Sequence, residues 1–373
     1  MVKRILPGST IGIVGGGQLG RMLALKAKEM GYKIAVLDPT ENSPTGQVAD
    51  TEIVASYDDL QAAQRLQEIS DVITYEFENI DAETLEWLVR NAYVPQGSKV
   101  IPTTQDRATE KKALEESGAR VATYELVYEL EDLKKAVKHI GYPCIIKTRR
   151  FGYDGKGQLT LTDDRDLDEA ATILQQGPCI IEQMVNFAKE ISVIVTRSVL
   201  GEVKTFPVAW NIHRNHILHQ SVVPAQVHEI VEARARKLAV SIAEHLDVVG
   251  TLGVEMFLTE ADELYVNEVA PRPHNSGHFT QNACVTDQFE QHIRAITGFS
   301  LGETKLYSEV VMVNILGQHI DPLLNGIADS PKAKVHLYGK AEAKQNRKMG
   351  HVNFLGNNFS TINKEIEKMN IWG

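Results

Sequence analysis

One stretch of the chain decides the fold: Asn267-Glu268-Val269-Ala270-Pro271-Arg272-Pro273-His274-Asn275-Ser276-Gly277-His278. It brings a carboxylate, a guanidinium, two imidazoles and carboxamides together on a path stiffened by two prolines. Upstream, the apolar run 248–258 contains a second carboxylate, Glu255, and the polar segment 259–263 separates this run from residues 264–269, in which Asn267 and Glu268 lie among apolar residues. Two apolar runs on either side of a short polar segment predict a β-hairpin.

The hairpin predicts a metal site. If its turn is centred between Ala261 and Asp262, Glu255 and Glu268 face each other directly across the two strands. Like charges opposed at about 5 Å destabilise a sheet, and a divalent cation between them reverses that effect. Mg²⁺ commonly takes one or two carboxylates together with substrate phosphates. The alternative is a pair of solvated carboxylates on an edge hairpin.

Size and composition set the broad class. A chain of 373 residues is expected to form two or three domains. With 39 Lys and Arg against 49 Asp and Glu, the formal charge of −10 argues against a nucleic-acid partner. The three cysteines lack metal spacing and indicate a reducing compartment. Neither a signal peptide nor a long apolar run is found, so we expect a cytoplasmic protein without a membrane partner.

Three domains are predicted along the chain. Residues 1–105 alternate short apolar strands with helices, which indicates a Rossmann-like domain with a parallel sheet covered on both faces. Residues 106–300 mix strands and helices, and residues 301–373 are small and rich in strands. The fold class is therefore α/β and α+β.

A glycine motif opens the first domain. Gly15-Gly16-Gly17-Gln18-Leu19-Gly20 follows a strand, begins a helix, and matches G-x-G-x-x-G, with Asp38 at the end of the next strand. This is the dinucleotide fingerprint in its usual context, because backbone N–H groups at a helix N-terminus attract an anion. The motif leaves three readings open: a nicotinamide site, a phosphate or substrate pocket, and a tight turn that binds no dinucleotide.

A pair of glutamates ends another strand. Tyr75-Glu76-Phe77-Glu78-Asn79 lies where open α/β sheets bind ligands. We expect Glu76 to meet a polar substrate. The alternative is that Glu78 caps the next helix.

The middle of the chain carries features typical of nucleotide binding. The loop 151–158 places three glycines around Lys156, which suits a cover over phosphates, although a plain hairpin turn fits equally well. Lys147 ends an apolar strand, where it either meets an anion or extends to the sheet edge. The exposed backbone groups of residues 182–185 can form hydrogen bonds with adenine. Glu190 can accept hydrogen bonds from ribose hydroxyls, and the alternative is that Glu190 is a solvated glutamate.

Taken together, these segments resemble the ATP-grasp superfamily. Five motifs occur in one order: Gly15–Gly20, Tyr75–Asn79, Gly152–Gln158, Asn267–His278 and Arg347–His351. The residues of these motifs are similar to those of the PurK-type family of 5-(carboxyamino)imidazole ribonucleotide synthases, and the resemblance covers essentially the whole chain. One departure is visible, because many ATP-grasp sites have asparagine where this chain has Ala270, and Asn267 precedes the glutamate instead.

The resemblance implies an ATP-grasp fold with an N-terminal pre-ATP-grasp domain, a lid subdomain at about residues 120–190, and a homodimer. It implies an ATP-dependent carbon–nitrogen ligase of purine biosynthesis. The exocyclic amine of 5-aminoimidazole ribonucleotide would be carboxylated with bicarbonate, through carboxyphosphate, giving ADP and phosphate. ATP and Mg²⁺ are the implied cofactors, and the partners are small molecules.

The resemblance also implies site residues. The metal ligands would be Glu255 and Glu268, and the catalytic residues would be Arg272, His274, Asn275 and Lys156. ATP would be bound by Arg107, Lys147, Gly152, Tyr153, Asp154, Gly155, Lys156, Gly157, Gln158, Glu182, Gln183, Met184, Val185, Glu190, His213, Asn267 and Glu268. The ribonucleotide would be bound by Gln18, Glu76, Tyr153, Asp154, Arg272, Asn275, Ser276, Lys340 and Arg347.

Three other functions remain open at this point. A formate-using glycinamide ribonucleotide transformylase would share the nucleotide site. A nicotinamide-dependent oxidoreductase would use the glycine motif and Asp38. A non-catalytic nucleotide-binding regulator would need no charged cluster around His274.

Overall fold

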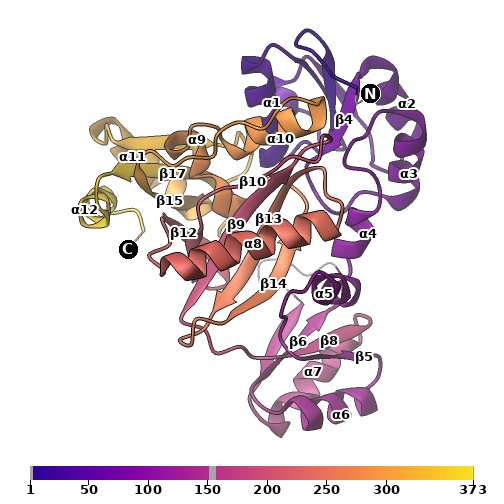
Figure 1. Cartoon of the computed structure of the whole chain (residues 1–373), viewed down its shortest axis with the longest axis vertical. Coiled ribbons are helices and arrows are strands. Elements are labelled where there is room, and N and C mark those ends of the chain that lie inside the picture. Colours follow the sequence, from indigo (N-terminus) through magenta and orange to yellow (C-terminus); the bar gives the residue numbers. More distant parts are fainter. Residues whose placement is uncertain (1–2, 151–156, 373) are drawn as a thin grey trace.

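A computed structural model describes residues 3–150 and 157–372 (Figure 1). The predicted loop residues Gly152, Tyr153, Asp154, Gly155 and Lys156 lie outside the described part. Within it, no helix is both long and apolar enough to cross a membrane. The strands of the described residues form three sheets.

The N-terminal sheet is parallel, with strand order β3-β2-β1-β4. The predicted βαβ arrangement is therefore confirmed. Asp59 and Asp81 start two of its helices by accepting hydrogen bonds from backbone N–H groups in the first turn. The strands are β1 (Thr10–Val14), β2 (Lys33–Asp38), β3 (Thr51–Val54) and β4 (Val72–Tyr75), and the helices are α1 (Gln18–Glu29), α2 (Leu60–Ile69) and α3 (Ala82–Asn91).

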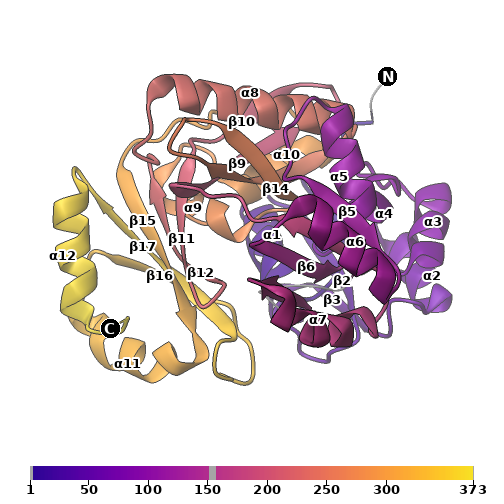
Figure 2. The ribbon, with the colours of Figure 1, turned by 90° about the horizontal axis from the view of Figure 1, so that it is seen from below.

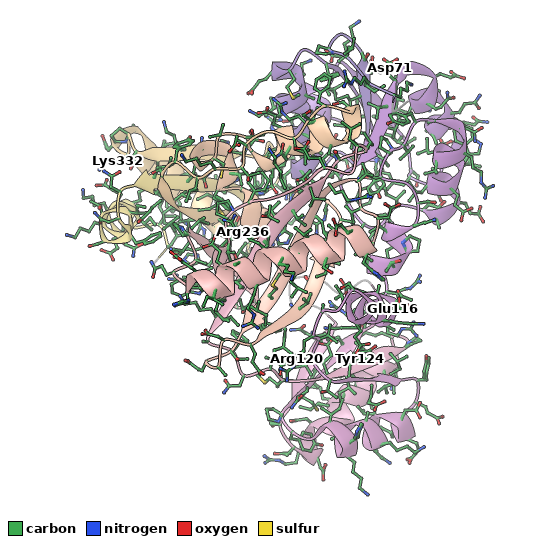
Figure 3. All side chains as sticks on the ribbon, in the orientation of Figure 1. Asp71, Glu116, Arg120, Tyr124, Arg236 and Lys332 are labelled. Atoms are coloured by element: carbon green, nitrogen blue, oxygen red, sulfur yellow. The ribbon has the colours of Figure 1, made fainter. Side chains whose placement is uncertain are left out.

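A small antiparallel sheet, with order β5-β8-β6-β7, projects from the rest of the molecule (Figure 1). Helices α4 (Val100–Thr104) and α5 (Arg107–Glu116) lead into it. Glu116, Arg120 and Tyr124 follow the chain out of α5 into this unit (Figure 3). Its elements are β5 (Tyr124–Val127), α6 (Leu130–Ile140), β6 (Cys144–Thr148), β7 (Gln158–Leu161), α7 (Leu167–Leu174) and β8 (Cys179–Gln183).

The large sheet runs β14-β13-β9-β11-β12-β15-β17-β16, with β10 beside β9. Because β12 pairs with β15, the strands after residue 300 extend this sheet instead of forming one of their own, and the proposed boundary at that residue stays a prediction. Its strands are β9 (Lys189–Arg197), β10 (Val203–Thr205), β11 (Ala209–Arg214), β12 (Ile217–Val223), β13 (Gly250–Leu258), β14 (Leu264–Ala270), β15 (Glu309–Leu316), β16 (Ala333–Leu337) and β17 (Lys348–Gly356).

Helices cover this sheet and supply its core. Helix α8 (Glu229–His245) crosses β9 and β13 (Figure 1), with Val231, Ala235, Ala239 and Ile242 buried at three- and four-residue spacing. At the other end of the sheet, α11 and α12 lie beside β15–β17 (Figure 2). The remaining helices are α9 (Thr280–Ala283), α10 (Gln288–Thr297), α11 (Ile320–Gly326) and α12 (Phe359–Met369).

Candidate active site

The hairpin β13–β14 places Glu255 directly opposite Glu268, as predicted. The route to that register differs from the prediction. Leu258 pairs with Leu264, so the turn is centred on Ala261, and a β-bulge shifts the register by one residue before the glutamates meet. The extra residue is Asn267, since Met256 pairs with Val266 and Glu255 with Glu268. The bulge therefore brings the two carboxylates face to face.

The electrostatics of this pair suit a cation. Burial and the charge of Glu268 raise the pKa of Glu255 to about 7. Burial opposes ionisation of Glu268 too, but Arg107, whose Nη1 lies 3.3 Å from its Oε2, together with Lys147 and Lys111 outweighs burial and lowers the Glu268 pKa. The described residues contain no group of three or more His, Cys, Asp or Glu side chains able to hold a metal. The two carboxylates fit Mg²⁺ in the arrangement in which substrate phosphates complete the coordination.

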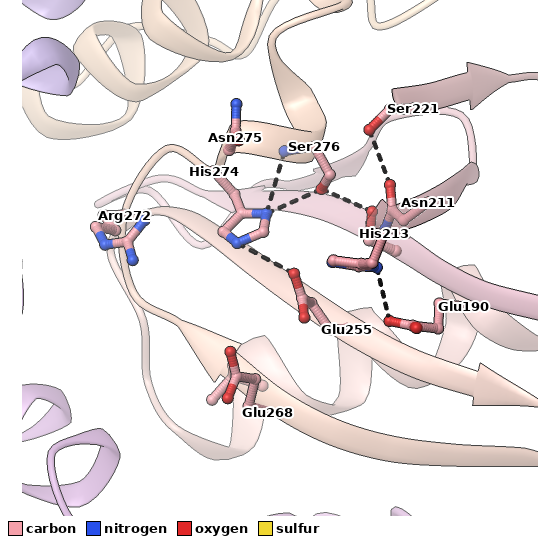
Figure 4. Close-up of polar contacts among 12 residues, drawn as sticks. Glu190, Asn211, His213, Ser221, Glu255, Glu268, Arg272, His274, Asn275 and Ser276 are labelled. Carbon is pink, nitrogen blue, oxygen red and sulfur yellow. Dashed lines mark hydrogen bonds and ion pairs between the residues drawn. The ribbon is translucent and has the colours of Figure 1, made fainter. Parts of the chain in front are cut away.

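His274 stands beside the carboxylates (Figure 4). Its Nε2 lies 3.3 Å from Glu255 Oε1, and its Nδ1 lies 2.9 Å from the hydroxyl of Ser276. Gln288 donates to the His274 carbonyl and accepts from its N–H, both at 2.9 Å. Burial and the charge of Arg272 hold the pKa of His274 well below its ordinary value. His274 is thus a neutral, firmly oriented imidazole.

The loop after β4 reaches the same cluster. Glu78 Oε1 lies 3.1 Å from Arg272 Nε, so the guanidinium is held against the N-terminal domain. The alternative role for Glu78, capping the next helix, is wrong because Asp81 caps α3 by accepting from the Thr84 N–H. Glu78 follows β4 and Asp81 precedes α3, so the two carboxylates are only three residues apart. The sequence motif alone does not show which of them caps the helix.

Two further predicted residues lie on different sides of His274. Ser276 also accepts a 2.7 Å hydrogen bond from Ser192 on β9. Asn275 points away from the carboxylate pair (Figure 4). Its carboxamide exchanges hydrogen bonds with Asn314 on β15, at 3.0 and 2.7 Å. A catalytic role for Asn275 stays a prediction, and Asn314, which sequence reasoning missed, gives it a structural partner.

The small sheet contributes a buried ion pair. Lys147 Nζ lies 3.1 Å from Glu182 Oε2, and Lys111 Nζ lies 3.4 Å from the same oxygen. Burial alone would raise the pKa of Glu182, but the two ammonium groups and the charge of Arg107 together outweigh it and bring the pKa to about 2. Burial lowers the pKa of Lys147. Lys147 therefore meets a carboxylate, as predicted, and does not extend to the sheet edge.

Glu190 and His213 are brought together from β9 and β11. His213 Nδ1 lies 3.0 Å from Glu190 Oε2 (Figure 4). Burial disfavours the imidazolium, yet the neighbouring carboxylate outweighs burial and raises the pKa of His213. Glu190 is accordingly not a solvated glutamate. Its ion pair lies beside the metal-type carboxylates, since Glu255 also contributes to the His213 shift.

The glycine motif is already filled by the protein's own carboxylates. Gly16 N–H donates to Asp38 Oδ2 at 2.6 Å, whereas Gly17 and Gly20 donate to the two oxygens of Glu76 at 2.8 and 3.1 Å. The helix N-terminus thus has internal anions where a dinucleotide would place its pyrophosphate. The nicotinamide reading of this turn is therefore not supported, and its reading as a phosphate or substrate pocket stays a prediction. Glu76 as a substrate ligand stays a prediction, with an internal role now added.

The remaining predicted residues are more dispersed. Lys340 Nζ donates to the Lys348 carbonyl at 2.8 Å, and the exposed Arg347 donates to the Glu342 carbonyl at 3.1 Å. Both lie in or beside the β16–β17 connection. Gln18 is half-buried at the start of α1. Their place in ribonucleotide binding stays a prediction.

The fold and site define an ATP-grasp enzyme. The ATP-grasp domain family matches residues 112–289, the ribonucleotide synthetase preATP-grasp domain matches residues 8–105, and the phosphoribosylaminoimidazole carboxylase C-terminal domain matches residues 310–365. An N5-carboxyaminoimidazole ribonucleotide synthase of Bacillus subtilis (strain 168) is 53% identical and spans 95% of this chain and 94% of its own. The chain belongs to the N5-carboxyaminoimidazole ribonucleotide synthases. The resemblance to the PurK-type family is therefore confirmed.

Solved structures agree. The ADP complex of a purK N5-carboxyaminoimidazole ribonucleotide synthetase is 58% identical, with a TM-score of 0.98 over 100% of this chain and 99% of its own. A synthase from Aspergillus clavatus in complex with ADP and 5-aminoimidazole ribonucleotide is 30% identical, with a TM-score of 0.91 over 97% of each chain. The transformylase, oxidoreductase and regulator alternatives are set aside by this family.

Proposed function

We propose that this protein carboxylates the exocyclic amine of 5-aminoimidazole ribonucleotide, using ATP and bicarbonate, to give 5-(carboxyamino)imidazole ribonucleotide, ADP and phosphate in purine biosynthesis. The observation that supports this proposal most directly is the register of β13 and β14, which places Glu255 opposite Glu268. Two opposed carboxylates on a sheet are unfavourable without a cation. Glu255 and Glu268 would therefore hold Mg²⁺, which when bound neutralises phosphate charge during transfer.

The protein's own groups supply alignment. Lys147, beside Glu182, and Arg107, beside Glu268, place positive charge along the path between the small and large sheets. Phosphoryl transfer needs positioning and charge neutralisation more than covalent help. In the proposed reaction, a bicarbonate oxygen attacks the γ-phosphorus and ADP leaves, forming carboxyphosphate. Adenine would lie against 182–185, and Glu190 and His213 would face the ribose.

The carboxylation step would use the cluster around His274. Arg272, pinned by Glu78, can offer a fixed guanidinium to bicarbonate and then to carboxyphosphate. Carboxyphosphate would release phosphate and pass its carboxyl carbon to the amine, which loses a proton. The departing phosphate can take that proton, while the neutral imidazole of His274, held by its contacts with Ser276 and Glu255, would help to orient the carboxyphosphate.

The ribonucleotide would lie against Gln18 and Glu76, with its phosphate near Lys340 and Arg347. We also propose a homodimer in the cytoplasm. The three buried, unpaired cysteines suit a reducing compartment, and light scattering of the purified protein measures its oligomeric state.

The test is phosphate release from ATP and Mg²⁺ with bicarbonate, with and without 5-aminoimidazole ribonucleotide. We expect strong stimulation by the ribonucleotide, and label from bicarbonate should enter an acid-labile product. Formate in place of bicarbonate is the control. Phosphate release that is independent of the ribonucleotide, or that requires formate, would contradict the proposed substrates.

A further inference from the structure

Helix α5 contains a lysine that no motif included. Lys111 has a side chain only 1% exposed. Its ammonium donates to the carbonyl of Asn267 at 3.0 Å and lies 3.4 Å from Glu182 Oε2. Asn267 is the bulge residue of β14 in the large sheet, whereas Glu182 lies on β8 in the small sheet. One buried ammonium therefore joins the two sheets between which the nucleotide would bind.

The rest of this helix face grips the same strand. Arg107 Nη1 lies 3.3 Å from the Glu268 carboxylate, and Glu110 Oε1 accepts from the Val269 N–H at 2.9 Å. Arg107, Glu110 and Lys111 follow the spacing that aligns side chains on one face of a helix. They thus hold three consecutive residues of β14, at the point where the bulge brings Glu268 opposite the other metal-type carboxylate.

The local charges favour an anionic ligand. Glu110 is engaged by the Val269 N–H of β14. Lys111 and Lys147 both lie against one carboxylate, that of Glu182. A fully buried ammonium is costly unless it is paired. Because Lys147 alone already pairs with Glu182, the ammonium of Lys111 adds a net positive charge to this cluster. That charge suits a nucleotide phosphate.

We propose that Lys111 is a positioning residue of the nucleotide and metal site. It acts through Glu182 and Asn267: it aligns the adenine-facing strand β8 with the metal-bearing strand β14 and holds the bulge that sets Glu268. This inference rests on the proposed ATP site. The next residue on the same helix, Lys112, has a side chain that is 74% exposed and serves as the matched comparison for the buried Lys111.

The test compares Lys111→Met with Lys112→Met by calorimetric titration of ADP into the whole protein, with and without Mg²⁺. We expect Lys111→Met to weaken MgADP binding about tenfold, with a smaller loss for ADP in EDTA, because the bulge beside Glu268 loses its anchor. Lys112→Met should bind as the wild type does. In turnover, the KM for ATP should rise while the KM for the ribonucleotide does not.

A second variant guards against misfolding. Lys111→Gln keeps a donor for the Asn267 carbonyl but loses the charge, and we expect it to weaken MgADP binding less than Lys111→Met does. Wild-type MgADP affinity in a folded Lys111→Met protein would overturn the proposal, as would failure of both variants to fold. Binding of ADP needs neither bicarbonate nor ribonucleotide, so this outcome is separate from failure of the proposed carboxylation.

Discussion

Glu255→Gln is expected to stabilise the metal-free protein while abolishing turnover. Burial and Glu268 raise the pKa of Glu255 from its ordinary 4.5 to about 7. The folded protein therefore keeps a proton that the unfolded chain releases near pH 4.5, and folding stability falls as the pH rises through this window. The difference between the folded and unfolded pKa values corresponds to a loss of about 3 kcal/mol of folding stability at about pH 8, where Glu255 is ionised in both states. Glutamine removes this penalty and also removes a metal ligand.

The assay is urea denaturation in EDTA at about pH 5 and about pH 8. Glu255→Gln should gain up to about 3 kcal/mol over wild type at the higher pH and much less at the lower one. The control is Glu260→Gln, an exposed residue of the same hairpin, which should change neither value. With ADP present, added Mg²⁺ should stabilise wild type more than the variant. An equal gain at both pH values, or none, would refute the electrostatic reasoning.

Three further outcomes are expected. Arg347→Ala should raise the KM for the ribonucleotide several-fold with little change for ATP, and steady-state kinetics that show equal effects would contradict the phosphate assignment. Gly20→Ala should cost about 1–3 kcal/mol in urea denaturation, because the new Cβ would lie 2.7 Å from the Gly15 carbonyl oxygen. Trp372→Ala should cost about 3 kcal/mol, since a 7% exposed indole and its 3.0 Å hydrogen bond to the Asn314 carbonyl are lost; unchanged denaturation would disprove that anchoring role.

The hairpin shows how far sequence reasoning reached. The facing of Glu255 and Glu268 was predicted from two apolar runs and the spacing between them, and it is confirmed. The turn centre was wrong by half a residue, and the bulge at Asn267 compensated for it. The bulge residue Asn267 accepts a hydrogen bond from Lys111, which lies far away in the sequence. No local sequence pattern in β14 predicts the bulge.

Contacts between distant segments were the hardest to foresee. The motif around Glu76 and Glu78 lies at the carboxyl end of β4, but the different contacts of the two glutamates depend on Arg272 and the glycine turn. Similarly, the pairing of Asn275 with Asn314 joins a short helical turn after β14 to the inside of β15, 39 residues further along the chain. A periodic pattern indicates which face of an element is buried, whereas the identity of a polar partner follows from tertiary packing.

The glycine turn has a consequence for how such motifs are interpreted. Asp38 and Glu76 occupy the N–H groups that a pyrophosphate would use, so the N-terminal domain satisfies its helix end without borrowing a ligand. No ligand is therefore needed to pair these three N–H groups. A G-x-G-x-x-G turn whose N–H groups are paired with the chain's own carboxylates, as here, does not by itself indicate a dinucleotide site.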